Sequence, residues 1–347
     1  MYTIFRYRNI ISIELPLLAV VRAPASYQKM SFLQKKGVIF LADSLAFNDC
    51  EVSSLYTAVA LFKKIQSLVY VPIYSLLDFL KIYRDVKKTI GFIWAGDALM
   101  YFSKRIIHKC NFEFYLQSLF KRGCGSEGYY TGNKEDRFAL LEKRLCKRYG
   151  IQCVCIPHGL EYSYKMPGGL VGDDFYCTSN NAKNYLSKLY GEQTVNFHFD
   201  EKVAAKMFSR EVKKNKERVI VFFPESREPE VNLKIMKFLV AEGFKLHVKL
   251  HVKDSVENYL PVLDRIEIIE LFDEAISNNI CLARKSTVLV EALYNNSIAI
   301  SVLIDNRDKS YVNLMFPSLV DPKILRAETF LQLKKELTDI KEEGLDV

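Results

Sequence analysis

The sequence predicts a two-domain α/β chain whose strands form parallel sheets, and three observations favour this fold class. The chain has 347 residues, enough for two compact domains. Short apolar runs rich in β-branched residues alternate with longer segments of helical periodicity. The charged segment Asp200–Arg218 lacks a strand pattern and predicts a linker. We therefore expect an N-terminal domain over 1–205 and a C-terminal domain over 206–347.

The apolar runs are predicted to be strands. Their near-continuous apolarity is typical of strands covered on both faces of a sheet. They are Val38–Ala42, Ser67–Val71, Ile90–Trp94, Gln152–Ile156, Val219–Phe223, Lys245–Leu250, Ile266–Ile269, Ile280–Ala283 and Ala299–Val302. Helical periodicity predicts helices over Asp136–Tyr149, Asn180–Leu189, Val231–Ala241, Thr287–Tyr294 and Ala327–Lys341. The apolar segment Ile10–Val21 is too short to span a bilayer and is predicted to be strand and loop.

Composition narrows the classes of partner. The formal net charge is +8, which fits a phosphorylated substrate or an anionic membrane surface. No basic–aromatic motif of a nucleic-acid module occurs, so no nucleic-acid partner is expected. The eight cysteines lack zinc-site spacing and are typical of reduced thiols. We expect a cytoplasmic protein, and its basic surface also fits peripheral association at the inner face of a membrane.

Polar residues follow most of the apolar runs, at the strand ends where open parallel sheets bind ligands. The set comprises Asp43-Ser44, Gly96-Asp97, Pro157-His158-Gly159, Pro224-Glu225-Ser226-Arg227, His251-Val252-Lys253-Asp254 and Arg284-Lys285-Ser286-Thr287. Several of these groups titrate or suit a phosphate. We therefore take them as the candidate site, with Glu225 and Gly159 among the expected donor contacts.

Ser286 and Thr287 stand between the run Ile280–Ala283 and a predicted helix. Either hydroxyl would cap that helix, whose first amides would then face the crevice and form an anion site. Arg284 would add charge for a diphosphate or phosphodiester. Glu291, one turn on, is placed to reach ribose hydroxyls. A plain helix cap with a structural glutamate is the alternative, and the clustering of these groups favours ligand binding.

The segment 246–253 alternates apolar and basic residues, so its histidines and lysines share one face. For His247 and Lys249 a solvated basic face is expected. His251 and Lys253 lie at the end of the strand, where they would meet a phosphate or protonate a leaving group. No carboxylate or third histidine stands at ligand spacing, so no metal site is expected.

The remaining candidates lie in the first half of the chain. A proline before His158 and Gly159 after it predict a sharp bend that holds the histidine. A buried, hydrogen-bonded turn histidine is the equal alternative, and Glu161 is close enough to orient it. Asp43 and Asp97 are candidates for the base that activates an acceptor hydroxyl, although helix capping is the commoner role of such an aspartate.

Three motifs occur in a recognisable order: the turn 157–159, the strand end Lys249-Leu250-His251, and the helix start Ser286-Thr287-x-x-x-Glu291-Ala292. Together they resemble the GT-B glycosyltransferases that build bacterial capsule and lipopolysaccharide. By pattern they are most similar to the bacterial sialyltransferases and polysialyltransferases, and the teichoic-acid glycerophosphotransferases share a similar set. Val252 departs from the pattern, because those enzymes usually have proline there.

The resemblance implies two Rossmann-like domains facing a central cleft, with the donor nucleotide held by the second domain. A CMP-linked sugar would be the donor and a surface glycan or glycolipid the acceptor, with no metal or other cofactor. His251 would contact the donor phosphate or assist departure of the nucleotide. Ser286 and Thr287 would bind phosphate, and Glu291 the ribose or base. Two alternatives stay open: a non-hydrolysing sugar-nucleotide epimerase of the same fold, and a non-catalytic partner in polysaccharide assembly.

Overall fold

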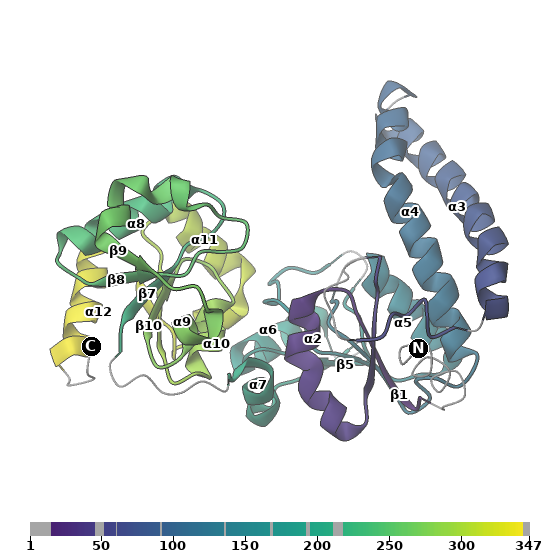
Figure 1. The fold of residues 1–347 in the computed structure, drawn as a ribbon, viewed down its shortest axis with the longest axis horizontal. Coiled ribbons are helices and arrows are strands. Elements are labelled where there is room, and N and C mark those ends of the chain that lie inside the picture. Colours follow the sequence, from purple (N-terminus) through teal and green to yellow (C-terminus); the bar gives the residue numbers. More distant parts are fainter. Residues whose placement is uncertain are drawn as a thin grey trace, which may run out of the picture. The chain divides into compact units, whose positions relative to one another are not determined.

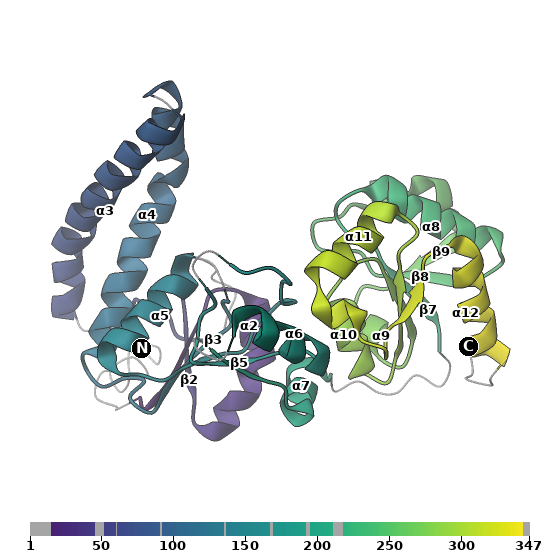
Figure 2. The same cartoon turned by 180° about the vertical axis from the view of Figure 1, so that it is seen from behind.

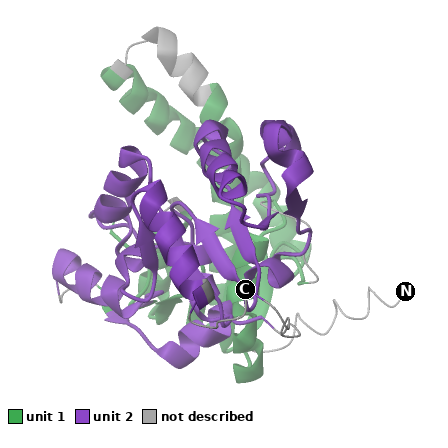
Figure 3. Ribbon diagram, turned by 90° about the vertical axis from the view of Figure 1, so that its left-hand side faces the viewer, with its two compact units in different colours: residues 1–158, 166–175, 194–196 green, residues 159–165, 176–193, 197–347 purple. Residues whose placement is uncertain are grey.

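The computed structural model describes residues 15–45, 52–59, 61–90, 92–134, 137–166, 169–191, 195–210 and 218–342. The chain divides into two compact units, which Figure 3 shows in different colours. Unit 1 comprises Met1–His158, Met166–Phe175 and Thr194–Asn196. Unit 2 comprises Gly159–Lys165, Tyr176–Gln193 and Phe197–Val347.

The first sheet has six strands in the order β2-β1-β3-β4-β5-β6. They are β1 (Leu17–Val21), β2 (Ile39–Ala42), β3 (Gly128–Thr131), β4 (Cys153–Cys155), β5 (Asp174–Tyr176) and β6 (Asn196–His198). β1 pairs in parallel with both of its neighbours, so that Leu18 lies opposite Ile39 and Tyr129. The chain runs from β1 to β2 on one side of β1 and then to β3 on its other side. The strand order therefore reverses between β1 and β3, which is the topological switch point of this sheet.

Helices connect the strands of the first sheet. They are α2 (Pro24–Met30), the 3-10 helix η1 (Ser31–Lys36), α3 (Leu61–Ile90), α4 (Phe92–Phe120), α5 (Arg137–Tyr149) and α6 (Asn180–Tyr190). α7 (Glu201–Phe208) follows the last strand of this sheet. α3 and α4 pack along each other and extend beyond the sheet of unit 1 as a long hairpin (Figures 1 and 2). This hairpin is a large insertion between β2 and β3.

The strands predicted at Ser67–Val71 and Ile90–Trp94 are wrong, because both runs lie in the hairpin. A short apolar run shows no period of its own and fits a helix as well as a strand. Asp97 consequently lies within α4 and not at the end of a strand. Its side chain is outside the described part of the structure.

The second sheet belongs to unit 2 and also has six strands, in the order β12-β11-β10-β7-β8-β9. They are β7 (Ile220–Phe223), β8 (Leu246–Val248), β9 (Ile266–Ile268), β10 (Ile280–Ala283), β11 (Ile298–Val302) and β12 (Leu325–Ala327). Every neighbouring pair is parallel. This is the strand order of a Rossmann domain, with its switch point between β7 and β10.

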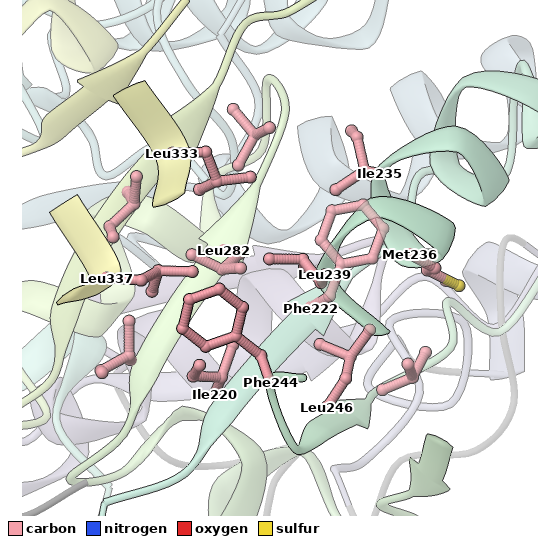
Figure 4. Close-up of a cluster of buried hydrophobic side chains, with 14 of the residues drawn as sticks. Ile220, Phe222, Ile235, Met236, Leu239, Phe244, Leu246, Leu282, Leu333 and Leu337 are labelled. Atoms are coloured by element: carbon pink, nitrogen blue, oxygen red, sulfur yellow. The ribbon is translucent and has the colours of Figure 1, made fainter. Parts of the chain in front are cut away.

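The helices of unit 2 bury the apolar faces of this sheet. They include α8 (Pro229–Ala241), η2 (Val256–Arg265), α9 (Phe272–Ile276), α10 (Val288–Leu293), α11 (Asn306–Met315), η3 (Pro317–Val320) and α12 (Phe330–Glu342). In the core, Phe222 and Leu282 of the central strands meet Leu239 of α8 and Leu337 of α12 (Figure 4). Truncating such a leucine to alanine typically lowers the free energy of unfolding by about 2–5 kcal/mol. The core therefore holds in place the strands whose ends carry the site.

The charged segment Asp200–Arg218 is partly helical. Asp200 caps α7 by accepting from the amides of Lys202 and Val203. Residues 211–217 lie outside the described part of the chain, and the domain boundary after residue 205 stays a prediction. The apolar run Ile10–Val21 ends in strand β1 as expected, while residues 10–14 are not described.

Candidate functional site

A pocket of about 440 Å³ lies at the carboxyl ends of the central strands of unit 2. The loops after β7, β8 and β10 form it, which places it at the switch point of the sheet. Its polar lining includes Glu225, Ser226, Arg227, Lys249, His251 and Ser286. The volume lies within the range of small-molecule sites. The strand-end rule thus brings together three of the predicted residues: Glu225, His251 and Ser286.

His251 presents a hydrogen-bond donor at this pocket. The amide of Lys253 donates to Nδ1 of His251 at 3.1 Å. Because Nδ1 accepts, the proton of the neutral imidazole resides on Nε2, which can donate to an anionic oxygen. The side chain of Lys253 does not line the pocket, so its predicted donor contact is not seen here.

The neighbouring positions of β8 also differ from expectation. Lys249 lines the pocket and is half-buried, with Nζ donating to the Leu250 carbonyl at 3.3 Å. His247 is buried, and its burial lowers its pKa. The expectation of a solvated basic face is therefore wrong for His247, while Lys249 is half-exposed and adds a positive charge to the pocket.

Glu225 brings a carboxyl group to the same pocket. It accepts from the amide of Lys285 at 2.9 Å and lies 3.5 Å from the Lys285 ammonium. Burial raises the pKa of Glu225, against the opposing charges of Lys285 and Arg284. A carboxyl group held in this way can accept from a sugar hydroxyl or exchange a proton at higher pH than a free glutamate.

The turn before α10 differs from the predicted anion site. The amide of Val288 donates to Ser286 Oγ at 3.3 Å, and the amide of Leu289 donates to the Ser286 carbonyl at 3.2 Å. Thr287 has helical dihedral angles and makes no side-chain cap. The first amides of α10 thus have partners within the turn, so the expectation of open amides is wrong. Phosphate binding by the side chains of Ser286 and Thr287 stays a prediction.

Arg284 does not reach the pocket, and its assignment to donor binding is wrong. The residue is fully buried, and its Nη2 donates to Glu228 at 2.5 Å and to Asp308 at 2.9 Å, while Nε makes a second bond to Asp308. Lys285 Nζ joins the network at 2.6 Å from Asp308. This charge cluster lies behind the pocket and fixes the loops that carry Glu225 and Lys285.

Glu291 is likewise engaged elsewhere. Its carboxylate lies 3.1 Å from Nη2 of Arg210, and both side chains are nearly buried. Glu291 is not among the residues that line the pocket. The structure therefore does not bring it to the position expected for ribose binding.

Unit 1 holds a second cluster, at the carboxyl end of β2. Asp43 is fully buried, and its Oδ2 lies 2.7 Å from Nε2 of His108 in α4. Its Oδ1 accepts from the hydroxyl of Tyr56 at 2.8 Å. Burial, and then the charge of Asp43, raise the pKa of Tyr56, so this hydroxyl stays protonated. Since the carboxylate accepts, Nε2 of His108 carries the proton and Nδ1 is the basic nitrogen.

This arrangement changes the role expected of Asp43. Its carboxylate is buried and occupied, so it does not reach a substrate directly. The His108 side chain, by contrast, is 18% exposed. Asp43 is placed to orient His108 and to stabilise its charged form, as in other carboxylate–histidine pairs. No local pattern in the sequence points to His108, which lies inside α4, a helix that was not predicted.

His158 lies at the carboxyl end of β4 in unit 1. Its Nδ1 is 2.8 Å from the Gly132 carbonyl, and its own carbonyl accepts from Lys29 at 2.9 Å. Because a carbonyl only accepts, Nδ1 carries the proton. The residue is exposed and not a buried turn histidine. Gly159 does not have a positive φ, and a Cβ there would meet open space.

Glu161 belongs to unit 2 and does not orient His158. It is buried and accepts from the amide and hydroxyl of Thr178 and from the hydroxyl of Ser318. It therefore holds the loop 159–165 to η3. Among the described residues, no three His, Cys, Asp or Glu side chains gather where they could hold a metal ion.

Glu228→Gln is expected to lower the free energy of unfolding near neutral pH, by an amount that shrinks in acid. The hydrogen bond from Arg284 holds the pKa of Glu228 below its usual range. Its stabilisation is therefore present above the unfolded pKa, about 4.3, and is lost as pH falls through the lower folded value. Urea unfolding between about pH 7 and about pH 3 measures this. Glu230→Gln, exposed in the first turn of α8, the helix that begins just after Glu228, is the control, and a pH-independent difference would contradict the ionic origin.

Comparison with known proteins shows the fold. No protein-family model matches the chain, and no curated protein matches it. Among solved structures it is similar to the UDP-GlcNAc 2-epimerase from Neisseria meningitidis bound to UDP-GlcNAc, with a TM-score of 0.53 and 11% sequence identity. The match covers 95% of this chain and 92% of that chain. The chain thus has a two-domain α/β fold of the GT-B type, and the predicted fold class is confirmed.

Proposed function

We propose that this chain is an enzyme that acts on a nucleotide sugar, and more specifically a metal-independent glycosyltransferase that moves the sugar to a hydroxyl acceptor. The main observation behind this proposal is the pocket at the β7–β10 switch point. Glu225, Lys249 and His251 line it, and its volume suits a small ligand. The sequence resemblance and the GT-B fold support the same function. Because fold alone does not assign an activity, the side chains of the pocket carry the proposal.

In this proposal unit 2 binds the donor and helps the nucleotide leave. Nε2–H of His251 and the ammonium of Lys249 stabilise the negative charge that develops on the departing phosphate. Glu225 accepts from a sugar or ribose hydroxyl. Because the donor hydrogen bond of His251 and the charge of Lys249 do this, a divalent ion is not needed, so added chelator should leave the activity unchanged.

Unit 1 supplies the base. Nδ1 of His108 takes the proton of the acceptor hydroxyl, the oxygen forms a bond to the anomeric carbon, and the bond from that carbon to the phosphate oxygen breaks. Asp43 stabilises the resulting imidazolium. From the resemblance, we propose a CMP-linked sugar as donor and a bacterial surface glycan or glycolipid as acceptor, at the cytoplasmic face of the membrane.

A thermal-shift panel of CMP, CDP, UDP and GDP tests the proposal first. A ligand that binds only the native state stabilises it by about 2.7 kcal/mol at a hundredfold excess over Kd, so one nucleotide should raise Tm clearly above the others. No shift with any nucleotide would refute donor binding and would favour the non-catalytic alternative.

His251→Ala is expected to slow acceptor-dependent nucleotide release by about 10²-fold, because the leaving phosphate loses a donor hydrogen bond. Lys253→Ala is the matched control: it keeps the amide that orients His251 and removes a side chain that does not line the pocket. Nucleotide release by initial rates measures both. Full activity of His251→Ala would remove the catalytic role given to this residue.

An epimerase is the second candidate, favoured by the likeness to the UDP-GlcNAc 2-epimerase. It would convert a nucleotide sugar without any acceptor. Incubation with UDP-GlcNAc alone, followed by chromatography of the sugars, separates the two: a new isomer favours the epimerase, and an unchanged sugar favours the transferase.

A further inference from the structure

Helix α3 of the hairpin exposes a long row of large apolar side chains. Among the described residues of this helix, the exposed ones are Leu61, Phe62, Ile65, Leu68, Val69, Ile73, Tyr74, Leu76, Leu77 and Leu80. Leu68 is 73% exposed and Leu76 59%. Contiguous apolar surface of this kind marks an interaction site, since monomeric soluble proteins expose only small apolar patches.

The opposite side of α3 is already used. Val71 packs with Ile106 and Cys110 of α4 in a small buried cluster. The exposed residues Ile65, Val69, Ile73, Leu76 and Leu80 recur at helical spacing and form a second stripe, which faces outward. Between residues 61 and 80 this stripe is about 30 Å long at 1.5 Å per residue.

Basic groups border the stripe. The segment 61–120 contains nine Lys and Arg against four Asp and Glu. Lys63, Lys81 and Lys88 lie on the same flank of α3 as Tyr70 and Tyr74 by helical spacing. The two tyrosines open onto a polar groove of about 730 Å³, whose lining includes Lys109, Lys121, Arg144 and Arg148.

We propose that the outer face of α3 docks on an anionic lipid bilayer, with its apolar stripe entering one leaflet and the basic flank meeting lipid phosphates. An amphipathic helix with aliphatic residues on one face and lysines beside them is the usual form of such a contact. This docking does not depend on the proposed transferase activity, and it would hold unit 1 at the surface where a lipid-linked acceptor resides.

The helix lies in the membrane plane in this proposal. Among the described residues, α3 is the one helix long and apolar enough to cross a membrane. Its inner side, however, carries Asp78, paired at 2.6 Å with Lys109 of α4. A bilayer core disfavours such charges, whereas a helix at the interface keeps them on its protein side. Pairing of two copies through α3 is less favourable, because a two-fold contact would bring their basic flanks together.

Vesicle flotation tests the proposal with the full chain. The probes are vesicles of phosphatidylcholine alone and of phosphatidylcholine mixed with phosphatidylglycerol. The wild type should float with the anionic vesicles. Leu76→Glu/Leu80→Glu should reduce its partition coefficient at least about 100-fold, because each leucine loses its burial in the leaflet and gains a charge. Leu260→Glu/Leu331→Glu, two exposed leucines of unit 2, is the matched control and should float like the wild type.

A second variant tests the basic flank. Lys63→Gln/Lys81→Gln/Lys88→Gln should weaken binding to the anionic vesicles by about fivefold per lysine and leave binding to neutral vesicles unchanged. Circular dichroism checks that each variant folds. The proposal is overturned if the wild type does not float, if both leucine pairs act alike, or if sedimentation shows a dimer that Leu76→Glu/Leu80→Glu dissociates while vesicle binding is unaltered.

Discussion

Replacing His108 by alanine is expected to lower the turnover of the acceptor-dependent reaction by about 10²–10⁴-fold, the range of a lost general base. The imidazole is tied through Nε2 to Asp43 at 2.7 Å, which leaves Nδ1 as its basic nitrogen. Initial rates at saturating donor measure kcat. The nucleotide-induced rise in Tm should not change, because the donor pocket lies in unit 2.

Asp43→Asn tests whether Asp43 acts by orienting His108 and not by contacting the substrate itself. An asparagine amide would donate to Nε2 and turn the imidazole to the other tautomer, so we expect kcat to fall by about 10²–10⁴-fold at nearly constant KM. Tyr56→Phe is the control, since it removes one hydrogen bond to Asp43 and leaves the His108–Asp43 pair in place. A higher KM with unchanged kcat in His108→Ala would show that His108 binds the acceptor and is not its base.

The sequence predicts the second sheet better than the first, for a physical reason. β7 and β10 are buried along their whole length, so their sequences are continuous apolar runs that predict a strand. Strands such as β5, with the sequence Asp-Phe-Tyr, are three residues long and half-polar, and they resemble loops. In the hairpin, Ser67–Val71 is apolar on both the buried and the exposed side of a helix. The periodicity that separates a helix from a strand is lost there.

The part of the candidate site that could be predicted consists of residues whose place in the fold follows directly from their place in the sequence. Residues directly after a parallel strand must lie at the edge of the sheet, and this places Glu225, His251 and Ser286 together. His108 meets Asp43 from 65 residues further along the chain, inside a helix. The burial of Arg284 depends in the same way on Asp308. Such long-range partners leave no local pattern in one sequence.

The buried charge cluster behind the donor pocket gives the second large effect. Asp308→Asn is expected to lower the free energy of unfolding by about 3–5 kcal/mol, because the fully buried guanidinium of Arg284 loses its principal counter-charge. Lys285 loses the same partner. Urea unfolding measures the loss. Asp339→Asn, exposed on α12, is the control and should stay within about 0.5 kcal/mol of the wild type.

A paired replacement tests whether the cost comes from the unpaired charge. Arg284→Met/Asp308→Leu removes both groups, and since apolar replacement of a buried ion pair is often neutral, the double variant should be more stable than Asp308→Asn alone. Its nucleotide-induced rise in Tm should nevertheless be smaller than in the wild type, because Arg284 and Asp308 also fix Glu228 and Lys285 beside the pocket. A double variant no more stable than Asp308→Asn would mean that the network contributes through shape and not through charge.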